Sequence, residues 1–86
     1  MNIIFKNKLT AAWVLQAMKD YINLYGVVTR KDLYQLYGDT PTVKDNTFSW
    51  TNLDAACIEE TYYDYDLGIK EYVLVLPRAV PLSGIV

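Results

Sequence analysis

The stretch EYVLVLPRAVPL, from Glu71 to Leu82, is the most strongly apolar and β-branched run in the sequence. Its first half contains five consecutive apolar or aromatic residues, Tyr72 to Leu76. A run this short between turn signals is typical of a strand covered on both faces, since a helix would need about ten residues or more. Pro77 ends the regular pairing because proline has no N–H to donate to a ladder. We predict that this strand is the centre of a small sheet and that the upstream elements cover it.

A long helix is predicted upstream, from Lys8 to Tyr25. Thr10 is its candidate N-cap, and Gly26 is a suitable left-handed stop after its last residue. Trp13 lies beside the apolar stripe and is expected at the edge of the core. The stripe itself recurs at helical spacing and consists of Val14, Ala17, Met18, Tyr21, Leu24 and Tyr25.

A second, shorter helix is predicted from Arg30 to Tyr37, after an extended link at residues 27–28. Thr29 and Asp32 have the spacing of a capping box at its start, and Gly38 ends it. A helix of this length is unstable alone, so we expect it to pack against the first helix.

The middle of the chain predicts a loop, a short strand and a turn. Residues 39–46 have the composition of a loop. The polar and apolar alternation of residues 47–50 favours a strand that presents Phe48 and Trp50 inward. The following residues, 51–54, are expected to form a turn or a single helical turn capped by Thr51.

Residues 55–63 are compatible with either a helix or a strand. The strand is favoured because Thr61, Tyr62 and Tyr63 are strand-forming residues. The sequence DYDLG, residues 64–68, then makes a plausible hairpin connection to the strand that opens near Ile69.

Composition indicates one ordered domain that spans residues 1–86. The content of apolar residues is 52%, which argues against disorder. Cys57 is the single cysteine, so it cannot form an internal disulfide, and we expect a buried, inert thiol in a reducing compartment. The apolar run at the start is too short for a signal peptide and no later run is long enough to cross a bilayer, which predicts a cytoplasmic protein without a membrane partner.

The residues needed for the common catalytic and cofactor chemistries are missing from the sequence. It has no histidine, which removes imidazole acid–base chemistry and the usual zinc ligand. No phosphate-binding glycine motif occurs, and the carboxylates do not have the spacing of a calcium loop. We therefore predict that the protein is not an enzyme and has no catalytic residue, no metal site and no cofactor.

The densest group of candidate binding residues is the acidic, tyrosine-rich sequence EETYYDYD. Tyrosines provide rigid contact surface, and clustered carboxylates attract a basic partner. As adjacent strand residues, Glu59 and Glu60 point to opposite faces. Asp64 and Asp66, as exposed loop carboxylates, are expected to tolerate reversal to lysine. The predicted binding residues are Glu59, Glu60, Tyr62, Tyr63, Asp64, Tyr65 and Asp66.

Three segments together resemble small uncharacterised proteins encoded by phages and by conjugative or other mobile elements. They are YGVVTRKDLYQLYG (residues 25–38), FSWTNLDAA (residues 48–56) and the closing EYVLVLPRAVPL. Ser49 stands where that family has a glycine, and the hairpin here is longer and more acidic. The resemblance implies a mobile-element origin and gives no activity.

The fold class expected is α+β, with two N-terminal helices packed on a small antiparallel sheet and a C-terminal hairpin. Its predicted function is a protein-interaction module that binds a host or element-encoded protein through the acidic hairpin. The alternative is a winged-helix-like nucleic-acid-binding protein, which is disfavoured by the sequence pI of about 4.8 and by an acidic hairpin where a basic wing would be expected. In that alternative the phosphate contacts would come from Lys6, Lys8, Lys19, Arg30 and Lys31.

Overall fold

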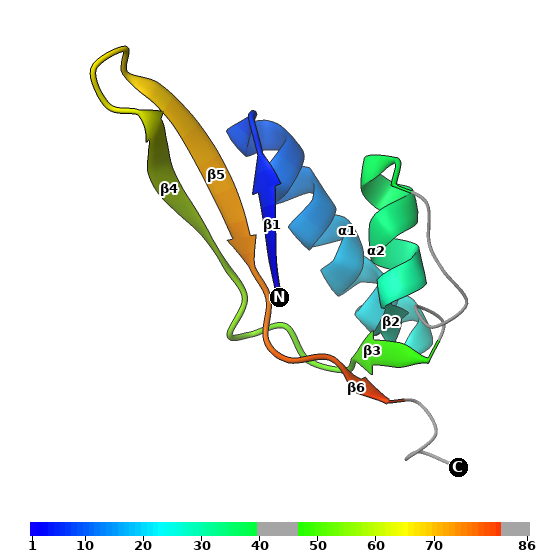
Figure 1. The fold of residues 1–86 in the computed structure, drawn as a ribbon. Helices are drawn as coiled ribbons and strands as arrows, with labels where there is room; N and C mark the ends of the chain where they lie inside the picture. Colours follow the sequence, from blue (N-terminus) through cyan, green and yellow to red (C-terminus); the bar gives the residue numbers. More distant parts are fainter. Residues whose placement is uncertain (40–46, 82–86) are drawn as a thin grey trace.

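The computed structural model describes residues 1–39 and 47–81, which form a mixed α+β fold with two helices and two small antiparallel sheets (Figure 1). The predicted fold class is therefore confirmed, whereas the loop predicted at residues 39–46 lies, from residue 40 on, outside the described residues. The elements are β1 (Asn2–Phe5), α1 (Lys8–Tyr25), β2 (Val28–Thr29), α2 (Arg30–Tyr37), β3 (Phe48–Trp50), β4 (Cys57–Asp64), β5 (Ile69–Val75) and β6 (Val80–Pro81).

The larger sheet has the order β1-β5-β4, so the strand predicted to be central is confirmed as the middle strand. Leu74 of β5 is fully buried and pairs with Ile3 of β1 on one side and Ile58 of β4 on the other. Alternation along the strands places these three side chains on one face of the sheet. This core face packs against buried residues of both helices, which include Ala11, Val14, Met18 and Leu33.

The opposite face of this sheet is open, so the expectation of a strand covered on both faces is wrong. Val73 and Val75 are only half-buried there, and Ile4 is 60% exposed. Both helices pack on the other face, and no described element covers this one. We call the residues that alternate onto this side the open face; they include Ile4, Cys57, Glu59, Ile69, Glu71, Val73 and Val75.

Helix α1 has the predicted bounds, but its cap and its last turn differ from the prediction. Asn7, rather than Thr10, is the N-cap: its Oδ1 accepts hydrogen bonds from the Leu9 and Thr10 N–H groups at 2.8 and 3.4 Å. Leu24 and Tyr25 are 72% and 70% exposed. At 100° per residue Leu24 lies well off the line through the buried residues, and Tyr25 is in the turn that ends at Gly26.

Helix α2 begins and ends as predicted. The Thr29 N–H donates to Asp32 Oδ2 at 3.0 Å, and the Asp32 N–H donates to Thr29 Oγ1 at 3.1 Å, which completes the capping box. Gly38 ends the helix with a φ of 86°, a left-handed conformation that only glycine adopts without strain. The ring of Tyr37 meets that of Phe5 edge to face at 5.8 Å, which ties this helix to β1.

The smaller sheet has the strand order β2-β3-β6. It brings β2, which directly precedes α2, close to β6, which contains the last described residues. Trp50 is 2% exposed and its Nε1 donates to the Pro77 carbonyl at 2.7 Å. The prediction that Phe48 and Trp50 face inward is incomplete, because Phe48 is half-buried and Ser49 between them is fully buried. Ser49 Oγ donates to the Val80 carbonyl at 3.4 Å, which satisfies this hydroxyl in the interior.

The predicted turn is found at residues 54–55, where the Ala56 N–H donates to the Leu53 carbonyl at 3.0 Å. Asn52, rather than Thr51, stabilises it, since Asn52 Oδ1 accepts a hydrogen bond from the Asp54 N–H at 2.7 Å. The choice of strand for residues 55–63 is confirmed from Cys57 onward. The prediction of a buried Cys57 is wrong, because the register puts this side chain on the open face, where it is exposed.

Candidate functional site

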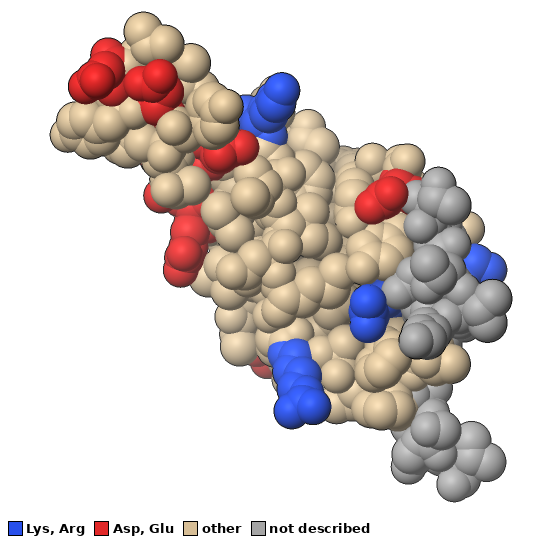
Figure 2. Space-filling model, viewed as in Figure 1, with Lys and Arg blue, Asp and Glu red and all other residues tan. Residues whose placement is uncertain are grey.

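The hairpin of β4 and β5 extends beyond the rest of the larger sheet (Figure 1). Strand β1 ends at Phe5, which pairs with Tyr72, so the β5 residues before Tyr72 pair only with β4. Figure 2 shows acidic side chains at the tip of this hairpin and down its outer side. Along its outer half the hairpin therefore has no other described strand paired with it.

The turn between the strands is built by its own polar groups. Asp64 Oδ1 accepts a hydrogen bond from the Leu67 N–H at 3.1 Å, and the Gly68 N–H donates to the Tyr65 carbonyl at 3.2 Å. Gly68 has a φ of 68°. Asp64 is also half-buried, so it is a structural residue of the turn and differs from the freely exposed carboxylate expected.

The tyrosines of the hairpin lie on both of its faces. Tyr62 and Tyr65 pack ring against ring, with centroids 4.8 Å apart, and Lys70 Nζ lies 5.6 Å from the Tyr62 ring centroid. A β-bulge between Tyr62 and Asp64 leaves Tyr63 as the extra residue and turns it away from this group. Their exposed fractions are 49% for Tyr62, 72% for Tyr63 and 79% for Tyr65.

Glu60 is the one predicted binding carboxylate that the described residues neutralise with two cations. Its Oε1 lies 3.4 Å from Lys8 Nζ and its Oε2 lies 3.6 Å from Lys70 Nζ. The hydrogen bond from Lys8, followed by the attraction of Lys70, holds the pKa of the Glu60 carboxyl below its ordinary value of 4.5. This carboxylate is thus less available to a partner than its neighbours are.

The predicted site residues are divided between the two faces. Glu60 and Tyr62 project from the core-face side of β4, together with Lys70 of β5, as the register requires. Glu59 projects from the open face, which confirms that the two adjacent glutamates point in opposite directions. A surface that uses all seven predicted residues at once must therefore wrap around an edge of the hairpin.

A hollow beside strand β5 of the hairpin was missed by sequence reasoning. It has a volume of about 430 Å³ and is lined by Lys6, Tyr63, Ile69, Lys70 and Glu71. The missing signal was β1: the sequence NIIF is too short to identify as a strand alone, and Lys6 reaches the hollow only because β1 pairs with β5.

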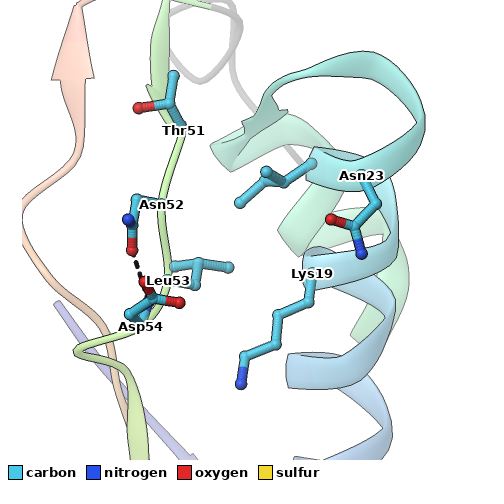
Figure 3. Close-up of a pocket in the computed structure, with 7 residues that line it drawn as sticks. Lys19, Asn23, Thr51, Asn52, Leu53 and Asp54 are labelled. Carbon is cyan, nitrogen blue, oxygen red and sulfur yellow. Dashed lines mark hydrogen bonds between the residues drawn. The ribbon is translucent and has the colours of Figure 1, made fainter.

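Two further hollows lie on the body of the protein. One, of about 340 Å³, lies between α1 and the turn after β3 (Figure 3). Its polar lining includes Lys19 and Asn23 from the helix and Asn52 and Asp54 from the turn, and Leu53 projects toward the helix beneath them. The other, of about 420 Å³, is lined by Met1, Arg30, Phe48, Arg78 and Ala79.

The basic side chains of the nucleic-acid alternative are dispersed over the molecule. Lys6 lines the hollow beside the hairpin, Lys8 pairs with Glu60, and Lys19 lines the hollow shown in Figure 3. The Arg30 guanidinium lies 5.0 Å from the centre of the Phe48 ring. In the view of Figure 2 the basic residues stand apart from one another rather than in one patch.

Within residues 1–39 and 47–81, no three acidic or cysteine side chains converge as metal ligands would. Neither helix there is both long and apolar enough to cross a membrane. Comparison of the chain with protein-family models, curated proteins and solved structures finds no match. The candidate site is consequently defined by its geometry and charge alone.

Proposed function

We propose that this protein is a non-enzymatic protein-interaction module whose working surface is the β4–β5 hairpin. The observation that carries the proposal is the combination of projection and exposure: the hairpin extends past β1 and presents Tyr62, Tyr63 and Tyr65 to solvent. Exposed aromatic side chains are enriched at protein interfaces, because they supply contact area at low entropic cost.

Charge indicates the kind of partner. Between residues 57 and 72 the chain carries five carboxylates and one lysine. A surface of this sign attracts a basic surface and raises the rate of encounter with it. The partner proposed is a protein with a basic face, and the resemblance to mobile-element proteins favours a host or element-encoded protein in the cytoplasm. The dispersal of the cations supports protein binding over nucleic-acid binding.

The test compares capture by the unchanged chain with capture by two charge variants. The hairpin variant carries Glu59→Lys and Asp66→Lys, and it spares Asp64, which stabilises the turn, and Glu60, which pairs with two lysines. The control variant carries Asp20→Lys and Asp54→Lys, which changes the net charge by the same amount outside the hairpin. Each immobilised protein is exposed to host lysate, and bound proteins are identified by mass spectrometry.

We expect a basic protein to be retained by the unchanged chain and by the control variant, and to be lost from the hairpin variant. With that partner purified, Glu59→Lys and Asp66→Lys should slow association, and Tyr63→Ser should speed dissociation. Equal capture by the hairpin variant and the unchanged chain would refute the hairpin as the working surface.

A further inference from the structure

Strand β4 is an edge of the larger sheet, and its outer side has no neighbouring strand among the described residues. It is also the longer of the two edges, with eight residues against four in β1. An edge strand presents a row of N–H and C=O groups that can pair with another chain. Which groups these are follows from the register.

The hydrogen bonds at the Leu76 end of the sheet show in which direction each main-chain group of β5 points. The Leu76 N–H donates to the Met1 carbonyl at 2.9 Å, and the Met1 nitrogen donates to the Leu76 carbonyl at 3.1 Å. These two residues are therefore a hydrogen-bonded pair, and by alternation Leu74 and Tyr72 also face β1.

The intervening β5 residues consequently face β4. They are Glu71, Val73 and Val75, whose partners are Thr61, Glu59 and Cys57. Within the regular run of residues 57–62, the main-chain groups of the three remaining residues, Ile58, Glu60 and Tyr62, then point outward. The bulge after Tyr62 ends this regular run, so the open edge is confined to residues 57–62.

We infer that this edge binds an extended strand of the partner protein, in which basic and apolar residues alternate. The inference rests on the proposed function and names its binding mode. On the open face the added strand lies beside Glu59, whose carboxylate has no ion pair in the described residues and complements a basic side chain. On the core-face side it lies beside Ile58, Glu60 and Tyr62. Glu60 is already paired with Lys8 and Lys70, so Ile58 and Tyr62 favour apolar neighbours on this side.

A second copy of the chain is a poorer occupant. Antiparallel self-pairing must match outward residues with outward residues, and the two longest registers centre on Glu59 or on Glu60. Each of these places a glutamate directly opposite its own copy, and like charges in that position are destabilising. The repulsion is strongest for Glu59, since Lys8 and Lys70 offset part of the Glu60 charge. The carboxylates that attract a basic strand thus also oppose self-association.

The experiment removes one outward hydrogen-bond donor from an otherwise unchanged chain. Residues 57–86 are synthesised and ligated to residues 1–56 at Cys57, with the Glu60 amide N-methylated. The control chain is N-methylated at the Asp66 amide, which lies in the turn outside the ladder. The probe is a fluorescent synthetic peptide in which lysine and valine alternate, and its counterpart has glutamate in place of lysine.

We expect the unmodified chain and the Asp66-methylated chain to bind the lysine peptide equally, and neither to bind the glutamate peptide. Methylation at Glu60 should weaken binding by about tenfold or more, since it removes a hydrogen bond and blocks close approach. Equal binding by both methylated chains, with binding still lost in the Glu59→Lys and Asp66→Lys variant, would overturn strand addition and leave the proposed function standing.

Two further results would also overturn the inference. One is that the lysine peptide does not bind the unmodified chain. The proposed function is then tested separately by the capture of proteins from host lysate. The other is concentration-dependent dimerisation of the unmodified chain, measured by sedimentation without peptide, that methylation at Glu60 abolishes. That result would assign the edge to a second copy.

Discussion

The carboxylate of Asp64 accepts a hydrogen bond from the Leu67 N–H at 3.1 Å, across the turn that joins β4 to β5. This contact lies within the candidate binding surface and holds its tip in shape. It separates two acidic residues that look equivalent in the sequence: Asp64 is half-buried and bonded, whereas Asp66 is exposed.

Substitution should distinguish the two aspartates. Asp64→Ala is expected to cost about 0.5–1.5 kcal/mol of unfolding free energy, because it removes the acceptor of the turn. Asp64→Asn keeps an acceptor oxygen and should cost less, and Asp66→Lys should stay within about 0.5 kcal/mol of the unchanged chain. Urea denaturation measures all three. A larger loss for Asp66→Lys than for Asp64→Ala would reverse these roles.

Glu60 predicts a pH dependence of stability. The pKa of its carboxyl in the folded protein is lowered, chiefly by Lys8. The ion pairs of Glu60 therefore stabilise the protein above pH 4.5, and this stabilisation is lost as the pH falls through the folded pKa. The stability difference between the unchanged chain and Glu60→Gln should therefore be present at neutral pH and vanish in acid. Denaturation at neutral pH and in acid measures this stability difference. An NMR titration in which the Glu60 carboxyl has a midpoint at or above 4.5 would contradict the pairing.

The two faces of β5 predict unequal costs of truncation. Leu74→Ala should destabilise the protein by about 2–5 kcal/mol, because this side chain is fully buried at the centre of the core. Val73→Ala, next to it on the open face, should cost clearly less. Both are measured by urea melts. A loss under about 1 kcal/mol for Leu74→Ala, or equal losses at the two positions, would show that the face assignment is wrong.

The start of α2 predicts a capping effect. Thr29→Ala should cost about 0.5–2 kcal/mol, because it removes the acceptor for the Asp32 N–H, while Thr29→Ser keeps that oxygen and should cost less. Thermal melts compare the two variants. If serine is as costly as alanine, the cost comes from the lost methyl group rather than from the cap.

Both helices could be predicted almost to the residue, because their boundaries depend on local chemistry. Gly26 and Gly38 adopt left-handed conformations that end a helix, and the capping box lies within four consecutive residues. Strand β1 could not be predicted this way. Its four residues form a strand because they pair with β5, about seventy residues along the chain.

Burial was harder to predict than secondary structure, since it depends on which face a neighbour covers. Cys57 and Ser49 illustrate this: the cysteine is exposed on the open face, and the serine is fully buried with its hydroxyl bonded to Val80. Both outcomes follow from strand register, which local sequence does not determine.

For the candidate site, the sequence predicts the composition of the surface but not its geometry. The exposed tyrosines and the opposed directions of Glu59 and Glu60 follow from alternation. The pairing of Glu60 with Lys8 joins residues far apart in the chain, and the open edge of β4 follows only from the strand order. Such nonlocal relations require the fold.

An open outer edge on β4 is the claim on which the binding mode depends, and amide hydrogen exchange of the free protein tests it most directly. Exchange followed by NMR should alternate along the strand, with slow amides at Cys57, Glu59 and Thr61, which face β5. Fast amides are expected at Ile58, Glu60 and Tyr62, which face solvent. Uniformly slow exchange across residues 57–62, or slow exchange at Ile58 and Glu60 with fast exchange at Glu59, would contradict an open edge with this register.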